Sequence, residues 1–247
     1  MTTRPPLPAS PAPALASRGP SRVLVLAVAL VATLILASPA AAAPAPSRLA
    51  DDHTSFFADG PLAGSGWSAC RAITWSVDVR GLPDDRRRAE VRRFAAAMDS
   101  WASAAGLDVD FTGRERLDYD ARAYLLRPNG PPRERHVYVS FLTPRQAPLL
   151  APPVVGLGNP SRVIAETREI TAGVVVFRSG FVAAAGRREP DRVRHLYLHE
   201  IGHALGLGHA ESTANIMHPA IGTRTSLGPG DRAGIRSLVQ ACPGTAQ

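Results

Sequence analysis

The sequence predicts an α+β domain, because segments of two different periodicities follow one another along the chain. In some short segments apolar and polar residues alternate, as in strands, and in longer ones apolar residues recur at helical spacing. Setting aside a leader-like stretch of 43 residues leaves 204 of the 247 residues. That length is enough for one domain with a substantial core.

The first predicted strand and the first predicted helix follow each other closely. Residues 73–79 alternate between apolar and polar side chains, so we expect a half-buried strand with Trp75 in the core. A helix then begins at Pro83, which is followed by two acidic residues, and it ends at Gly106.

Three further strands are predicted, at residues 107–111, 136–141 and 172–177. Outside the strand at 136–141, the segment 128–160 contains many Pro and Gly residues. We therefore expect that segment to be an irregular surface region.

Two helices are predicted in the C-terminal part of the chain. The first begins at Pro190, which has acidic residues on both sides, and runs to about Leu205, where Gly206 can end it. The second covers residues 231–239.

The N-terminal residues 1–43 have the features of a secretory signal peptide. Arg22 precedes fifteen uncharged residues, and a run of small residues ends at Ala43. The apolar stretch is shorter than the roughly 20 residues that span a bilayer, so we expect cleavage near Ala43 and secretion. The alternative is an uncleaved membrane anchor with the same domain outside the cell.

After the leader, we expect residues 44–66 to be a linker or a short pro-segment without a packed element, and residues 67–247 to be the folded domain. The two cysteines, Cys70 and Cys242, lie near the ends of that domain. In an exported protein such a pair is more often bridged than free. A bridge of this span would stabilise the fold by roughly 4–5 kcal/mol at most, and two buried thiols are the alternative.

The charge pattern gives no support for nucleic-acid binding. All 28 basic residues are Arg, and outside the leader 25 of them face 21 acidic residues, a balance of +4. The arginines are scattered among the acids, and the densest cluster, at residues 86–93, is typical of a solvated helix face. We expect a monomer, with no stable membrane association once the leader is removed.

The most informative stretch contains three histidines. His199 and His203 are four residues apart and share one helix face, with Glu200 beside them. A catalytic zinc ion needs three protein ligands and one open position. His209 can be the third ligand if the chain turns after His203, and Gly206 is suited to such a turn.

This pattern, HExxHxxGxxH followed by a methionine, resembles that of the metzincins. Met217 lies eight residues after His209, within a sequence similar to the Met-turn of the matrixin branch. Residues 231–238 also resemble the start of that branch's C-terminal helix. The resemblance extends over roughly residues 70–242 and is specific in the last fifty of them.

The resemblance implies a metzincin-like zincin fold, with a twisted, mostly parallel sheet, long helices, an active-site helix and the Met-turn. It also implies a zinc metalloendopeptidase that hydrolyses polypeptides with zinc-activated water. His199, His203 and His209 would hold one catalytic Zn²⁺, and Glu200 would act as the general base. Asp231 is expected to support the Met-turn by hydrogen bonding.

The sequence also departs from the family pattern. There is no pro-segment cysteine motif of the matrixin type, and Cys70 has the wrong surroundings for one. Gly230 replaces the first acid of a family pair, so we expect no salt bridge from there to the mature N-terminus. Ile221 stands where the family's specificity pocket has Tyr. A second zinc ion cannot be matched to residues, and calcium stays open because no residues indicate it.

The remaining histidines are not predicted to be ligands. His195 lies one turn before His199 and is expected beside the site or at its rim. His53, His136 and His218 are expected to be surface residues or hydrogen-bonded polar groups.

A peptide substrate is expected to lie extended against an exposed strand edge. The predicted edge contains Val174, Val175 and Val176. Residues 219–221, including Pro219 and Ile221, are predicted to form a wall of the pocket for the side chain beyond the cleaved bond, which we expect to be apolar or of medium size.

Two alternatives remain open at this stage. One is an exported zinc-containing binding or structural module without turnover. Glu200 argues against it, because a structural zinc site uses a fourth protein ligand and gains nothing from an adjacent carboxylate. The other is a zinc hydrolase that acts on a non-peptide amide.

Overall fold

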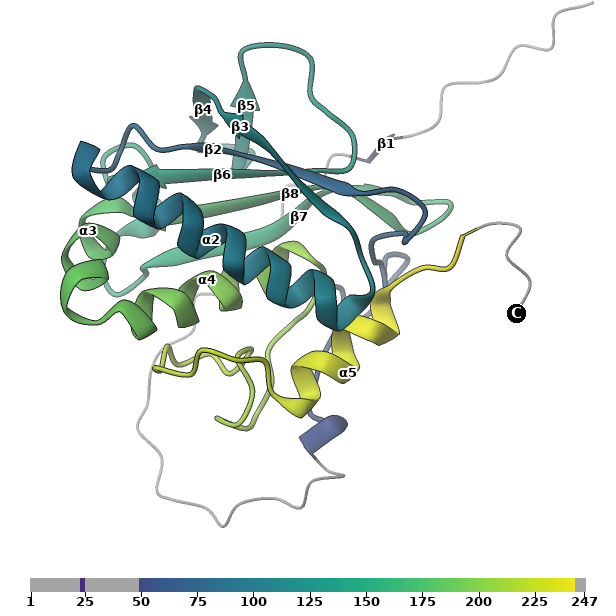
Figure 1. The fold of residues 1–247 in the computed structure, drawn as a ribbon. Coiled ribbons are helices and arrows are strands. Elements are labelled where there is room, and N and C mark those ends of the chain that lie inside the picture. The colour runs from purple at the N-terminus through teal and green to yellow at the C-terminus, as the bar shows by residue number, and fades with distance from the viewer. Residues whose placement is uncertain (1–22, 25–48, 243–247) are drawn as a thin grey trace, which may run out of the picture.

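The computed structural model describes residues 23–24 and 49–242, and these form an α+β fold around a mostly parallel sheet (Figure 1). The sheet has the strand order β1-β7-β8-β6-β2-β3, in which β2, β3, β6 and β8 are parallel and β1 and β7 pair antiparallel. The strands of this sheet are β1 (Val23–Leu24), β2 (Ile73–Asp78), β3 (Val109–Arg114), β6 (His136–Leu142), β7 (Gly156–Ile164) and β8 (Glu169–Arg178). A separate antiparallel pair comprises β4 (Leu117–Asp120) and β5 (Leu125–Pro128).

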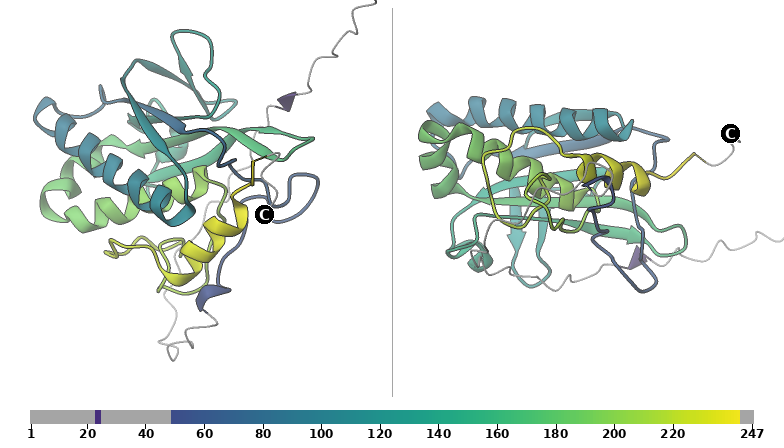
Figure 2. Two further views of the ribbon diagram at one scale, coloured as in Figure 1. Left: turned by 45° about the vertical axis from the view of Figure 1, so that its right-hand side comes forward. Right: turned by 90° about the horizontal axis from the view of Figure 1, so that it is seen from below.

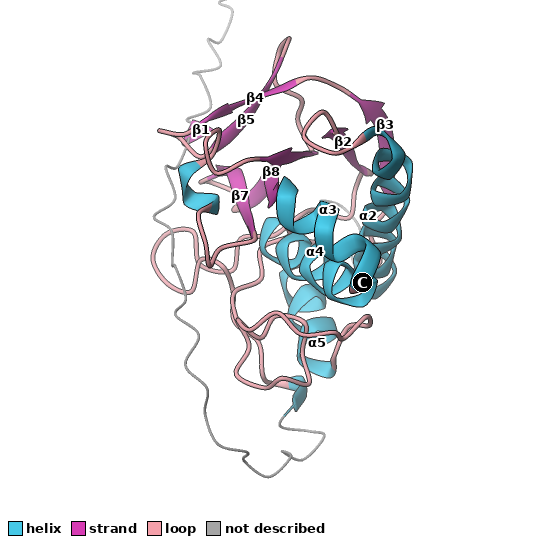
Figure 3. Cartoon of the chain, turned by 90° about the vertical axis from the view of Figure 1, so that its left-hand side faces the viewer, coloured by secondary structure: helices cyan, strands magenta, loops and turns pink. Residues whose placement is uncertain are grey.

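The long helices lie on one face of the sheet, where α2 and α4 pack side by side (Figures 2 and 3). The helices are α2 (Asp84–Ala105), α3 (Ser179–Arg188), α4 (Pro190–Ala204) and α5 (Pro229–Leu238), with one 3₁₀ turn at η1 (Pro148–Leu150). Within the described part of the chain, no helix is both long and apolar enough to cross a membrane.

Aromatic side chains from the sheet and the helices form the centre of the core. The ring of Phe94 on α2 lies 5.1 Å from that of Trp75 on β2 and 5.7 Å from that of Tyr197 on α4. Two buried indoles also bond to the backbone of α4: Trp101 Nε1 donates to the Leu198 carbonyl at 2.8 Å, and Trp67 Nε1 donates to the Ala204 carbonyl at 3.1 Å. These two bonds flank the segment of α4 that carries His199, Glu200 and His203.

Most of the predicted elements are present, with small shifts of their bounds. Helix α2 begins just after Pro83, and Gly106 ends it with a left-handed φ of 67°. The first strand is more buried than predicted, because β2 is an inner strand with Phe94 of α2 on one face and the segment around Leu117 on the other. Its polar residues Ser76 and Asp78 are therefore buried as well, and the Asp78 carboxylate accepts hydrogen bonds from Arg80 and from the Leu117 N–H.

The prediction of an irregular surface region at 128–160 is wrong in its last part. Strand β7 begins at Gly156, and it packs against α4. Its first residues, Gly-Leu-Gly-Asn-Pro, have the composition of a loop. Helix α3 also lies outside the elements that the sequence predicts.

The predicted substrate edge at Val174, Val175 and Val176 is wrong. Strand β8 pairs with β6 on one side and with β7 on the other, so its backbone has no free edge. β7 lies outside it, and among the described residues β1 covers only the end of β7, at Val163 and Ile164.

The expectation that residues 44–66 hold no packed element is wrong for the part that the structure describes, residues 49–66. The Phe56 N–H donates to the Gly206 carbonyl at 2.7 Å, and Leu62 and Ser65 are buried. Most of the predicted leader, and residues 44–48, lie outside the described residues. The domain boundaries therefore stay predictions.

The structure contains a disulfide between Cys70 and Cys242, with a Cα–Cα distance of 5.2 Å. It joins the chain before β2 to the chain after α5, where the Ala69 N–H also donates to the Gln240 carbonyl. The bridge thus closes a loop that contains all the functional residues predicted from the sequence.

We expect the double variant Cys70→Ser/Cys242→Ser to unfold at lower denaturant concentration than the native chain. Because 172 residues separate the two cysteines, the loss in the free energy of unfolding should approach about 4–5 kcal/mol. Urea denaturation monitored by circular dichroism measures it. Mass analysis of unreduced digests should find the two cysteines in one cross-linked peptide, and freely alkylated thiols in native protein would contradict the bridge.

Candidate metal centre

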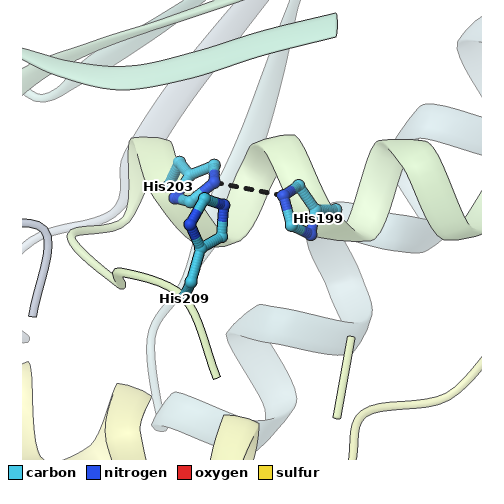
Figure 4. A group of neighbouring side chains, drawn as sticks. All are labelled: His199, His203 and His209. Carbon is cyan, nitrogen blue, oxygen red and sulfur yellow. Dashed lines mark hydrogen bonds between the residues drawn. The ribbon is translucent and has the colours of Figure 1, made fainter. Parts of the chain in front are cut away.

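Three histidines converge at the C-terminal end of α4 (Figure 4). His199 and His203 project from successive turns of the helix, and His209 follows after the chain has left it. Gly206 adopts a φ of 107°, a conformation that favours glycine, and this turn brings His209 back toward the helix. One ring nitrogen from each histidine lies within 4.8 Å of the other two.

Hydrogen bonds fix which ring nitrogen of two of these histidines carries the proton. His199 Nδ1 lies 2.9 Å from the Ile216 carbonyl, and His203 Nδ1 lies 2.8 Å from the Leu207 carbonyl. A carbonyl oxygen can only accept, so in both neutral rings the proton is on Nδ1. The two Nε2 atoms, 3.1 Å apart, are left with lone pairs that face each other.

Two facing lone pairs are suited to a shared cation. Burial, followed by the proximity of the other histidines, lowers the pKa of His203 to about 4 and that of His199 well below its ordinary value. Burial and the neighbouring His218 also lower the pKa of His209. Three neutral imidazoles oriented in this way fit the ligand set of a catalytic zinc ion.

Glu200 lies next to His199 in sequence but points toward β7. Its side chain is almost fully buried, and this burial raises its pKa to about 8, although the Gly158 N–H donates a hydrogen bond to it. A Cβ atom on Gly158 would overlap the backbone oxygen of Glu200, and one on Gly156 would lie 2.8 Å from its Oε1. The glycines therefore let β7 approach the glutamate closely.

Met217 packs against α4 at Gly202, where an added Cβ atom would overlap its sulfur. The Asp231 carboxylate on α5 accepts the N–H groups of Ile216, Met217 and Gly228 at 2.6, 3.0 and 2.6 Å. The predicted hydrogen-bonding role of Asp231 is confirmed. Burial raises the pKa of Asp231, and the three N–H donors oppose that shift.

The other four histidines lie outside the group of three. His195 is buried and its Nδ1 donates to the Arg224 carbonyl at 3.1 Å. His136, which is fully buried, lies between the hydroxyl groups of Thr74 and Ser76. His53 contacts the Ala50 carbonyl, and His218 accepts the Ala220 N–H.

A pocket of about 580 Å³ lies between His195 and the loop that follows Met217. Ile221 is among the lining residues and Pro219 is not. Eight of the eleven lining residues have polar side chains. The lining residues are His195, Thr213, Asn215, His218, Ala220, Ile221, Gly222, Thr223, Arg224, Thr225 and Ser226.

Nothing in the sequence indicates that Gly156 and Gly158 contact Glu200. The only available signal was the pair of glycines at alternate positions, which can mark a close approach of backbone in a strand. The segment before Trp67 was also missed, because it contains few apolar residues at regular spacing.

Comparison with known families gives a match over the part of the chain that contains these residues. The family model described as Matrixin matches residues 168–240, the span from β8 through the histidines and Met217 to the end of α5. Over these residues the chain is similar to the matrixins. The match indicates zinc metalloendopeptidase activity on a polypeptide substrate. A search of curated proteins found no match.

We expect Gly158→Ala to disturb the matrixin-like site, because the added methyl group has no space next to the Glu200 backbone. Overpacking of this kind lowers the free energy of unfolding by about 1–3 kcal/mol. Gly130→Ala is a matched control, since a Cβ atom there has no described atom within 4 Å. Urea denaturation of both variants measures the difference, and equal stability of the two would contradict the close packing of β7.

Proposed function

We propose that this matrixin-like chain is a secreted zinc-dependent endopeptidase in which Glu200 is the general base. The observation that supports it best is the buried carboxylate of Glu200, which follows His199 on the helix that carries two of the three neutral imidazoles. A purely structural zinc site would have a fourth protein ligand instead, and the described residues include no fourth member of the group.

His199, His203 and His209 would hold the ion. When bound, zinc would supply Lewis acidity, polarising the scissile carbonyl and making a water molecule more acidic. Glu200 would accept a proton from the attacking water on a carboxylate oxygen and then deliver it to the leaving nitrogen. The hydrogen bond from the Gly158 N–H would keep the carboxylate oriented during both transfers.

Strand β7 is the better candidate for the substrate-binding edge. Its residues 156–160 pair with β8 on one side and, among the described residues, with no strand on the other. The same stretch contacts Glu200 through Gly156 and Gly158. An extended peptide that pairs with this edge would bring its scissile bond close to the general base.

The pocket between His195 and the loop that follows Met217 would accept the side chain that follows the cleaved bond. Ile221 contributes an apolar part of its wall, but the polar residues around it argue against a purely apolar preference. Secretion rests on the sequence of residues 1–43, and a retained membrane anchor is the alternative. No observation favours a non-peptide amide over a peptide.

Glu200→Gln separates metal binding from catalysis. The change keeps the size of the side chain and leaves all three imidazoles in place, so bound zinc should stay near one ion per chain. Peptide hydrolysis should fall by roughly 10² to 10⁴ or more, because a positioned general base is lost. His203→Ala should instead lower zinc content and hydrolysis together.

Zinc content by atomic absorption and cleavage of a peptide library provide the measurements. Glu166→Gln is the matched control, because this glutamate is exposed in the turn between β7 and β8. Near-native hydrolysis by Glu200→Gln, or no cleavage of any peptide by the zinc-loaded native protein, would favour the binding-module alternative.

N-terminal sequencing of the exported protein should begin near Pro44. The expectation follows from Arg22, the uncharged stretch at 23–37 and the small residues that end at Ala43. A species that keeps residues 1–37 and sediments with membranes would show that the segment is an anchor.

A further inference from the structure

A segment near the N-terminus, residues 49–57, pairs with the loop that carries His209, and we call it the strap. The Phe56 N–H donates to the Gly206 carbonyl at 2.7 Å, and the Gly208 N–H donates to the Thr54 carbonyl at 2.8 Å. Ser55 and Leu207 form an antiparallel bridge between these bonds. The strap therefore acts as a short strand beside residues 206–208, immediately before the third histidine.

Two side chains of the strap extend this pairing beyond the backbone ladder. Thr54 Oγ1 donates to the carbonyl of His209 itself at 2.8 Å. The Asp52 carboxylate accepts the N–H groups of Glu211 and Ser212 at 2.7 and 2.8 Å. These bonds hold the backbone on both sides of the His209 side chain.

Asp52 also connects the loop to the Met-turn. Its Oδ2 accepts Asn215 Nδ2 at 2.8 Å, and Asn215, which is fully buried, accepts the Gly230 N–H at 3.0 Å. Gly230 is the first residue after the proline that opens α5, the helix whose Asp231 binds the Met-turn backbone. One carboxylate therefore connects the strap, the His209 loop and α5.

The glycines at two of these contacts leave room for the strap. A Cβ atom on Gly230 would overlap the Asp52 carbonyl oxygen, and one on Gly208 would overlap Thr54 Oγ1. The absence of an acid at position 230 thus has a steric reason here, because the strap crosses the start of α5 at that point.

We propose that Asp52 and Thr54 are positioning residues of the metal centre, which hold His209 where it can complete the ligand set with His199 and His203. The proposal rests on the proposed zinc site. Neither residue belongs to the group of three histidines. Both act through the backbone of residues 209–212. Groups that orient metal ligands in this way commonly change metal affinity or activity by 10- to 100-fold.

The opposite role, that of an inhibitory pro-segment, predicts a different geometry. An inhibitor would place a ligand or a blocking side chain among the three histidines, whereas the group of three contains no strap residue. Phe56 approaches His203 only edge to face, with 5.9 Å between ring centroids. The strap therefore supports the site and should be kept in the mature protein.

The test compares Asp52→Ala, Asp52→Asn and Thr54→Val in the full chain, with Asp51→Ala as the matched control. Asp51 is exposed, and its side chain makes no hydrogen bond to the described residues. The zinc dissociation constant, measured by chelator competition, should rise roughly 10- to 100-fold in Asp52→Ala. It should rise less in Asp52→Asn, which keeps one carbonyl acceptor, and in Thr54→Val, and stay unchanged in the control.

Thermal unfolding of the metal-free variants separates positioning from a merely structural role. A lower melting temperature with unchanged zinc affinity, measured where the variants are folded, would overturn the proposal. Faster peptide hydrolysis by Asp52→Ala would also overturn it and would identify an inhibitory segment. If Asp52→Ala does not fold, Thr54→Val, which removes one hydrogen bond, carries the same comparison. Zinc affinity can be measured even if the native protein cleaves no peptide, so the two proposals can fail separately.

Discussion

Two hydrogen bonds from histidine rings to backbone carbonyls determine what the site can bind. The Ile216 and Leu207 carbonyls fix the protons of His199 and His203 on Nδ1, and burial keeps both rings neutral. The two Nε2 lone pairs then face each other at 3.1 Å, an arrangement that a shared cation would stabilise. Both carbonyls belong to the chain that follows α4, so the ligand geometry depends on how that chain is held.

The structure holds that chain with carboxylates, because residues 205–228 contain no helix or strand that could satisfy their backbone. Asp231 accepts N–H groups of the Met-turn from the C-terminal side, and Asp52 accepts N–H groups of the His209 loop from the N-terminal side. The disulfide between Cys70 and Cys242 and the bonds of Trp67 join the segment before β2 to the segment after α5 and to the end of α4.

The sequence predicted the parts whose signals are local. The helical spacing around α2, the glycine turn after α4 and the histidine pattern each lie within a few tens of residues, and all are present. Strand β7 was not predicted, because its glycines interrupt the alternation of apolar and polar residues that is typical of a strand. These glycines are where β7 contacts Glu200. The error at Val174 has a different cause: an unbroken apolar run is typical of a strand buried between neighbours, yet it was interpreted as an edge.

The strap shows why such contacts are hard to read from sequence. Asp52 and Ser212 are 160 residues apart, and the bonds between them use a carboxylate and backbone N–H groups, which leave no hydrophobic period along the chain. Closing so long a loop is entropically costly, and the buried core around Trp67 and α4 offsets that cost. The third ligand is therefore ordered only in the folded chain. Zinc binding and folding should be coupled here even though the other two ligands lie on one helix.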